Sequence, residues 1–177
     1  MPKQDPIRPT DDEARTLARS LIDGATYGAI GVLDPESQTP MVTRIAIGTD
    51  TDGTPVTLVS DLSAHTRALK ANAACSLLLG EPGDKGDPLI HPRLTLQCHA
   101  RFLHHADDGH AALRAHYLAS HPKAKLYVDF GDFAFVRFTI VSALLNGGFG
   151  QAFRLSESDF RTVLYRRNTD TIPTPRT

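Results

Sequence analysis

Two long stretches of alternating residues constrain the fold of this chain more than any other feature. The stretch 93–103 alternates strictly, and its apolar face consists of Leu94, Leu96, Cys98, Ala100 and Phe102. From Phe133 to Val141 the period is again two residues. This period is typical of a β-strand, whose successive side chains point to opposite faces of a sheet. The chain is therefore predicted to fold around long, half-buried strands.

The composition fits one domain. The chain has 177 residues, of which 41% are hydrophobic, so it is long enough to bury a core of its own. Its formal net charge of -1 provides no chain-wide positive field to attract nucleic acid or anionic lipid. The N-terminal residues lack the apolar segment of a signal peptide, and no apolar run is long enough to span a bilayer. We therefore expect a cytoplasmic protein that binds neither nucleic acid nor a membrane.

The first part of the chain predicts a lead-in, a helix and three strands. Residues 1–10 contain three prolines and are expected to be a flexible lead-in. Thr10-Asp11-Asp12-Glu13 has the spacing of a capping box, and apolar residues then recur with a helical period until Gly24. Tyr27–Leu33 reads as a buried strand. Between Pro40 and Ser60, two strand-like runs flank an Asp-Gly turn, which predicts a β-hairpin, and a short helix follows.

The rest of the chain continues the β pattern. Ala73–Leu79 is a further short strand, Gly80–Pro92 is a long loop, and helices are expected at 106–119 and 122–127. After Gly150 we expect a last strand segment and a helical turn capped at Ser156. About six strands joined by short links predict a mainly β fold with flanking helices, namely an antiparallel barrel. This single domain is expected to span residues 11–165 and to be followed by a polar tail at 166–177. No glycine-rich dinucleotide or phosphate loop is present, which argues against the nucleotide-binding α/β folds.

The strongest candidate binding site is the junction at residues 60–67, where a strand gives way to a helix. It combines three hydroxyl groups, an imidazole, a guanidinium and one carboxylate, from Ser60, Ser63, Thr66, His65, Arg67 and Asp61 respectively. Free N–H groups at a helix start, together with such donors, would bind a phosphate well. Ordinary capping of the helix by Ser63 uses the same geometry, so the residues leave both interpretations open. Arg44 lies in a strand and is expected to bind an anion or to pair with a carboxylate across the sheet.

Other polar groups carry less weight. His104, His105, Asp107, Asp108 and His110 resemble a metal-binding set, but they lie where a strand runs into a helix, and their carboxylates suit capping better than coordination. Cys75 and Cys98 lie in separate strands without metal-ligand spacing, so we expect two reduced, buried thiols. No catalytic triad or metal site is recognisable. A reaction on this chain would therefore need a cofactor to carry the chemistry.

Several segments in a fixed order resemble the FMN-binding split-barrel family related to pyridoxamine 5′-phosphate oxidase. Residues 121–133 and 145–150 are similar to the branch of that family that includes haem-utilisation proteins. The segments that carry the resemblance are Thr43-Arg44-Ile45-Ala46, residues 60–67, Asn72-Ala73-Ala74-Cys75-Ser76-Leu77-Leu78, Pro92-Arg93-Leu94-Thr95-Leu96, His121-Pro122, Tyr127-Val128-Asp129-Phe130 and Asn146-Gly147-Gly148-Phe149-Gly150.

The resemblance implies a six-stranded antiparallel split β-barrel and a homodimer with FMN at the subunit interface. It places one group of residues along the flavin and another around its phosphate and ribityl chain. Together these cofactor-binding residues are Thr43, Arg44, Ile45, Ser60, Asp61, His65, Thr66, Arg67 and Arg93. The chain has His65-Thr66-Arg67 where the oxidase has an Arg-Lys pair, and it lacks the oxidase's C-terminal Arg-x-His pattern, which argues against pyridoxamine phosphate as the substrate.

Three functions follow from these observations. The leading expectation is an FMN-binding flavoprotein that oxidises or reduces a small molecule, with catalytic residues and substrate unassigned. The alternative is a split-barrel protein that binds haem or another tetrapyrrole without flavin chemistry. The third is an interaction module that keeps the barrel and the dimer but binds no cofactor.

Overall fold

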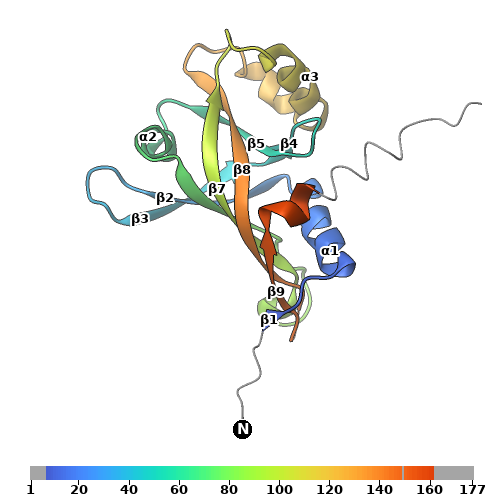
Figure 1. Cartoon of the computed structure of the whole chain (residues 1–177). Coiled ribbons are helices and arrows are strands. Elements are labelled where there is room, and N and C mark those ends of the chain that lie inside the picture. The colour runs from blue at the N-terminus through green and yellow to red at the C-terminus, as the bar shows by residue number, and fades with distance from the viewer. Residues whose placement is uncertain (1–6, 149, 162–177) are drawn as a thin grey trace, which may run out of the picture.

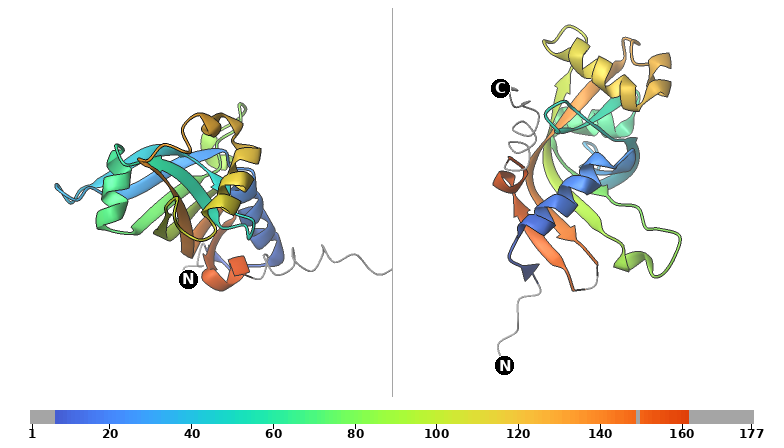
Figure 2. Two further views of the ribbon diagram at one scale, coloured as in Figure 1. Left: turned by 90° about the horizontal axis from the view of Figure 1, so that it is seen from above. Right: turned by 90° about the vertical axis from the view of Figure 1, so that its right-hand side faces the viewer.

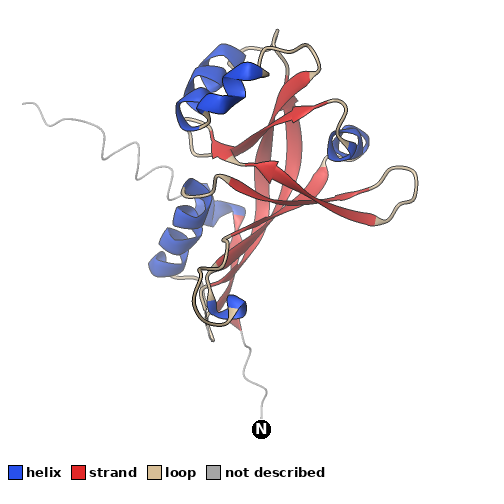
Figure 3. Ribbon diagram, turned by 180° about the vertical axis from the view of Figure 1, so that it is seen from behind, coloured by secondary structure: helices blue, strands red, loops and turns tan. Residues whose placement is uncertain are grey.

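A single curved sheet forms the centre of the molecule (Figure 1). The computed structural model describes residues 7–148 and 150–161. Within them the sheet runs in the order β1-β9-β8-β7-β6-β2-β3, and β5 pairs with both β8 and β4. The strands are β1 (Ile7–Arg8), β2 (Tyr27–Leu33), β3 (Pro40–Ala46), β4 (Gly48–Thr49), β5 (Pro55–Ser60), β6 (Ala74–Leu79), β7 (Arg93–Leu103), β8 (Phe133–Asn146) and β9 (Ala152–Ser156). With helices around this sheet (Figure 3), the predicted mainly β fold is confirmed.

The two alternating stretches become the longest strands, β7 and β8. They pair with each other along their whole shared length, with one register shift beside Gln97. The other edge of β8 is shared: β5 pairs with residues 133–137, and β9 pairs with residues 142–146. The strand β8 therefore joins two parts of the sheet, and residues 138–141 lie between them.

The predicted hairpin between Pro40 and Ser60 is only partly correct. The Asp-Gly turn forms, but just two residue pairs of β4 and β5 flank it. Residues 40–46 instead pair with β2 as β3, from Pro40 opposite Leu33 to Ala46 opposite Tyr27. The buried Ile47 separates β3 from β4 and donates its N–H to the carbonyl of Thr26. The run turns a corner there because its two ends belong to different parts of the barrel.

The chain termini also differ from expectation. About six strands were predicted and the described residues contain nine, since the 40–49 run splits, the two-residue β1 is added, and the strand segment expected after Gly150 forms a separate strand, β9. Within the predicted flexible lead-in, Ile7 and Arg8 join the sheet, in parallel with Ala152 and Phe153 of β9. Residues 1–6 and the predicted polar tail at 166–177 lie outside the described residues.

Two hydrophobic clusters cover opposite faces of the sheet. The larger cluster fills the concave side and includes Leu96, Phe138 and Leu145 together with the buried stripe of α1 (Asp12–Asp23), which lies diagonally across the sheet in Figure 2. The smaller cluster lies beneath α3 (His110–Ser120) and η2 (Pro122–Leu126). Residues 134–136 of β8 are buried on both faces because Phe135 belongs to the smaller cluster and Val136 to the larger one.

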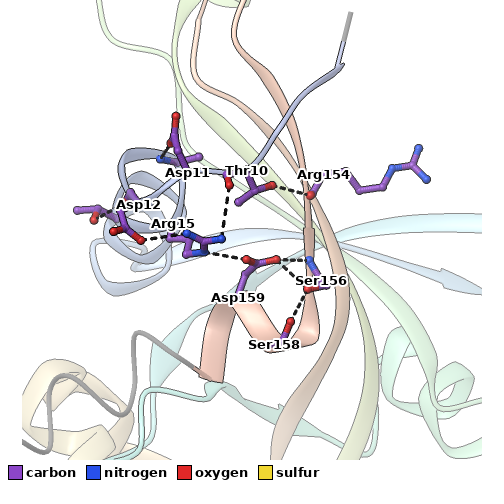
Figure 4. Close-up of polar contacts among 10 residues, drawn as sticks. Thr10, Asp11, Asp12, Arg15, Arg154, Ser156, Ser158 and Asp159 are labelled. Carbon is purple, nitrogen blue, oxygen red and sulfur yellow. Dashed lines mark hydrogen bonds and ion pairs between the residues drawn. The ribbon is translucent and has the colours of Figure 1, made fainter. Parts of the chain in front are cut away.

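The start of α1 is confirmed as a capped helix, but its cap lies one residue later than predicted. The side chain of Asp11 accepts a hydrogen bond from the N–H of Ala14, whereas the Thr10 hydroxyl donates to the carbonyl of Arg154 in β9 (Figure 4). Arg15 in turn donates to Asp159 over 2.8 Å, in the helical turn at residues 157–161. The helix end is thereby attached to the last strand of the sheet.

The region after β7 also begins its helix later than predicted. Residues 104–109 form turns, in which the Asp107 carboxylate accepts from the N–H of His104, and α3 begins only at His110 after Gly109, whose φ is +87°. The predicted second helix is the 3₁₀ helix η2, and the Gly80–Pro92 loop contains the short η1 (Pro88–Ile90). None of the helices in the described residues has the length and apolar character to cross a bilayer.

Candidate functional site

A cleft of about 330 Å³ lies where β3, β5 and the start of α2 (Ala64–Ala71) meet. β3 and β5 are not paired with each other, so their facing edges leave room for a ligand between them. Volumes of roughly 300–1,000 Å³ are typical of small-molecule sites. The cleft is open to solvent. It is lined by Arg44, Ile45, Ala46, Leu58, Val59, Ser60, Ser63, His65, Tyr127 and Phe133.

His65 is held in position from the first turn of α2. Its Nδ1 atom is 3.0 Å from the Thr43 hydroxyl of β3, so one nitrogen of the ring is already occupied. The ring is partly buried, and this burial lowers the pKa of His65 below its ordinary value. The imidazole is therefore neutral at pH 7, and its Nε2 atom is available to a ligand in the cleft when the proton is on Nδ1.

Ser60 connects the α2 junction to the segment that precedes β8. Its hydroxyl donates to the Asp132 carboxylate over 2.7 Å and accepts from the N–H of Leu62 over 3.1 Å. The N–H of Asp61 donates to the carbonyl of Asp132 over 2.8 Å. These contacts hold the start of α2 against residues 127–133, and thus set the width of the cleft.

The lining of the cleft includes two aromatic rings and one cation. The rings of Tyr127 and Phe133 lie 5.1 Å apart between centroids. The exposed guanidinium of Arg44 lies over the ring of Tyr27 at 5.4 Å, in a cation–π contact. The predicted pairing of Arg44 with a carboxylate is therefore not seen, and its partner across the sheet is an aromatic ring, while anion binding by Arg44 stays a prediction. A flat ligand with an anionic edge matches this arrangement.

The structure brings together about half of the predicted site residues. Arg44, Ile45, Ser60 and His65 line the cleft, and Thr43 supports it through its contact with His65. Sequence reasoning missed Tyr127, Phe133 and Leu58 as cleft residues. Their aromatic or apolar character was visible in the sequence, but only the pairing of β5 with β8 places them beside α2.

Four predicted residues lie elsewhere. Asp61 forms an ion pair with Lys70 over 2.7 Å. Thr66, a residue of α2, is fully buried. Arg67 donates a hydrogen bond to the carbonyl of Leu62 and lies near the β2–β3 turn. In that turn, hydrogen bonds from Ser37 lower the pKa of Asp34, and the positive charge of Arg67 lowers it further. These three residues do not line the cleft.

Arg93 is the fourth residue that the structure separates from the site. It pairs with Asn146 at one end of β7, whereas the opposite end, at Leu103, lies beside the part of β8 that carries β5. Its guanidinium donates to the carbonyl of Leu89 over 2.8 Å. Within one chain, Arg93 therefore cannot share a ligand with the residues of α2.

Ser63 occupies the N-cap position of α2, but its side chain makes no capping hydrogen bond. The capping interpretation is therefore wrong for its hydroxyl, which instead faces the cleft. The first N–H groups of any α-helix lack intrahelical acceptors and carry a partial positive charge. The start of α2 can thus contribute to binding an anion next to Arg44.

Polar side chains also gather outside the cleft, in a pocket of about 290 Å³ whose lining includes Arg19, Arg101, Arg137 and Arg161. In the described residues, no group of three or more His, Cys, Asp or Glu side chains has the geometry to hold a metal ion. Of the histidines near α3, His105 is bound to the carbonyl of Val128 through Nε2. Both cysteines are free and buried, as predicted, and burial raises the pKa of Cys75 to about 12. These thiols are consequently inert in the folded state.

A second groove, of about 500 Å³, lies on the outer face of the sheet between β2, β6 and β7. Its floor is mostly uncharged, with His99 at one end. This face also exposes Leu33, Val42, Leu78, Val141 and Leu144, each at least 40% accessible. Such a cluster of exposed apolar side chains on a sheet is typical of an interaction surface.

Comparison with known proteins finds similarity to two proteins whose names refer to haem. It is 35% identical over 120 residues to the non-canonical heme oxygenase HOZ of Arabidopsis thaliana chloroplasts, and the match covers 67% of this chain and 36% of that protein. The heme binding protein from Mycobacterium smegmatis is 28% identical, with a TM-score of 0.76, and the alignment covers 88% of this chain and 62% of that structure. The chain thus spans about a third to two thirds of the length of these relatives.

More distant structures share the fold. ChuZ of Campylobacter jejuni is 15% identical with a TM-score of 0.76 over 86% of this chain and 63% of that chain. A Clostridium acetobutylicum protein of the pyridoxinephosphate oxidase family is also 15% identical, with a TM-score of 0.63 over 85% and 99% of the two chains. These likenesses show the split-barrel fold and confirm that part of the predicted resemblance. The family model of the CREG β-barrel matches residues 9–162, and the chain therefore belongs to the CREG β-barrel family.

Proposed function

We propose that this protein binds a tetrapyrrole, haem in the first place, in the cleft between β3, β5 and α2. The observation that carries the proposal is the combination of the aromatic wall formed by Tyr127 and Phe133 with the cation of Arg44. A porphyrin presents the matching chemistry, a flat apolar ring with two carboxylates at one edge. The sequence relatives named for haem binding or haem oxygenation support this ligand over a flavin.

The residues present fit such a ligand. Leu58 and the two aromatic rings would contact the macrocycle, and Arg44, Ser63 and the N–H groups at the start of α2 would bind its carboxylates. When bound, haem supplies an iron centre able to coordinate or activate small molecules. The protein's part is to orient the ring and to exclude water from one face.

FMN, the ligand favoured by the sequence, is the second candidate. The hydroxyls of Ser60 and Ser63 at the start of α2 favour a phosphate there. However, the Ser60 hydroxyl already donates to Asp132, a carboxylate that would repel a phosphate dianion. Arg67, which the resemblance assigns to the phosphate, lies outside the cleft. A porphyrin with two separate monoanionic groups meets less of this repulsion, so we rank haem first.

The same reasoning supports a homodimer. The cleft is open on one side, and a large planar ligand would project beyond one chain. On the exposed apolar face around Leu78 and Val141, most residues that pair across neighbouring strands are uncharged. One example is the row of Val42, Gly31 and Ser76. An exposed apolar patch of this kind suits a two-fold symmetric contact with a second copy. We propose that this copy covers the face.

Titration of the purified protein with haemin and, separately, with FMN tests the function. We expect a saturable shift of the haem Soret band at one equivalent per chain and no comparable change with FMN. Replacing Arg44 with Ala should weaken haem binding about tenfold, the size expected for one charge-assisted contact. Arg161→Ala is the matched control, because Arg161 is exposed in the turn at residues 157–161 and does not line the cleft. A folded protein that leaves the haemin spectrum unchanged would refute the proposal.

A further inference from the structure

His65 is the histidine whose surroundings best match those of a metal ligand. It faces the cleft, it is partly buried, and Thr43 holds its Nδ1 atom at 3.0 Å. In metal sites, the ring nitrogen that does not bind the metal is usually held by a hydrogen bond, which sets the tautomer and the direction of the ring. The Thr43 contact supplies this feature, because the hydroxyl oxygen can accept the Nδ1 proton and leave the Nε2 lone pair for the ligand.

The remaining histidines fit this role less well. The Nε2 atoms of His110 and His121 lack hydrogen-bond partners, but both are buried, against Phe135 and Tyr117 respectively. Neither lines the cleft. His99 lines the outer groove and not the cleft. Only His65 thus combines a fixed ring with access to the aromatic wall, among the described part of the chain.

Neighbouring residues of β3 contribute to the cleft in two different ways. Arg44 lies on β3 next to Thr43, and the two side chains point to opposite faces of the strand, as consecutive residues do. Thr43 is thereby directed to α2, while Arg44 is left at the open edge of the cleft with its exposed guanidinium. Arg44 and His65 both line the cleft, so one ligand can contact the guanidinium and the imidazole.

We infer that His65 would hold the iron of haem in this cleft through its Nε2 atom, and that Thr43 is the positioning residue of His65. This inference depends on the proposed haem function but adds a residue and an atom to it. Binding would require no redox step: the neutral imidazole donates its lone pair, and the Nδ1 proton stays on the ring and is shared with the Thr43 hydroxyl. Removal of that hydroxyl should change the electronic character of the iron without emptying the site.

The test uses the full chain with ferric haemin and reads the Soret band and the electron paramagnetic resonance signal. We expect His65→Gly to shift both signals and to weaken haem binding at least tenfold. Free imidazole should restore the original spectrum by occupying the space that the side chain leaves. His116→Ala is the matched control, since His116 is exposed on α3 and does not line the cleft.

Thr43 is tested by its valine and serine variants. Thr43→Val keeps the shape but removes the hydroxyl, which should lower the basicity of His65 and raise the reduction potential of the bound iron. Thr43→Ser should restore the original potential. A purely structural role of Thr43 would leave the potential of the valine variant unchanged and would thereby overturn its assignment.

The outcomes separate the two proposals. If the wild-type protein binds no haemin, the proposed function and the ligand assignment are both wrong. If it binds haemin and His65→Gly, shown to be folded by circular dichroism, keeps the wild-type spectra, the function stands and the assignment of His65 is refuted. A spectrum that is lost in His99→Ala but not in His65→Gly would move the site to the outer groove.

Discussion

The hydrogen bond from Ser60 to Asp132 should stabilise both the fold and the cleft, and its contribution can be worked out from the structure. The hydroxyl and the carboxylate are 2.7 Å apart, and both side chains are partly buried. Hydrogen bonds to charged groups contribute about 1.5–3 kcal/mol when well shielded, and partial exposure reduces this to roughly 1–2 kcal/mol. Because Ser60 also accepts from the N–H of Leu62, Ser60→Ala should lose at least the lower value.

The measurement is a double-mutant cycle by urea unfolding of the wild type, Ser60→Ala, Asp132→Ala and the double variant. We expect each single change to lower the free energy of unfolding by about 1–2 kcal/mol, which corresponds to roughly 2–8 °C in Tm for a chain of this size. The coupling energy between the two should be about 1 kcal/mol. Ser63→Ala is the matched control, since the Ser63 side chain forms no capping hydrogen bond, and it should change stability by less than about 0.5 kcal/mol.

Two results would contradict this reasoning. If the losses of the single variants simply add in the double variant, Ser60 and Asp132 do not stabilise each other. If Ser63→Ala costs as much as Ser60→Ala, the effect belongs to the helix start in general rather than to the link with Asp132. An unchanged urea dependence across the series is needed for either comparison, because it shows that the unfolded states are alike.

Three further predictions address other parts of the molecule. Burial lowers the pKa of His110, and the nearby His105 lowers it further, so as pH falls below about 6.5 the unfolded chain binds a proton on this residue before the folded chain does. Tm should therefore decrease between pH 7.5 and pH 5.5, and it should decrease less in His110→Gln. A Tm that does not depend on pH would contradict this prediction. Gly28→Ala should destabilise by about 1–3 kcal/mol in thermal unfolding, because its Cβ would lie 2.7 Å from a Leu79 methyl and 2.9 Å from a backbone oxygen; Gly131→Ala, with no atom within 4 Å, is its control and should be near neutral. Leu78→Glu on the exposed outer face should convert a dimer into a monomer in light scattering, and a monomeric wild type would refute the proposed dimer.

The individual strands could be predicted because their signals are local. The alternation of residues 93–103 and of the stretch from Phe133 becomes β7 and β8, since one face of each strand is buried and a period of two is the direct result. The helix α1 was equally visible from its apolar stripe, and its cap differed by only one residue. In each case neighbouring residues in the sequence are sufficient to specify the element.

Strand pairing and the composition of the cleft were decided by the tertiary structure. The local pattern between Pro40 and Ser60 is the same for a hairpin and for a corner. The difference is that β3 pairs with β2 rather than with β5. Likewise, Tyr127 and Phe133 come to lie beside His65 because β5 pairs with β8, a contact between segments more than 70 residues apart. The sequence alone determined which residues could bind an anion and which could form strands. Their assembly into one cleft, with Arg67 and Arg93 left outside it, required long-range packing that no local pattern encodes.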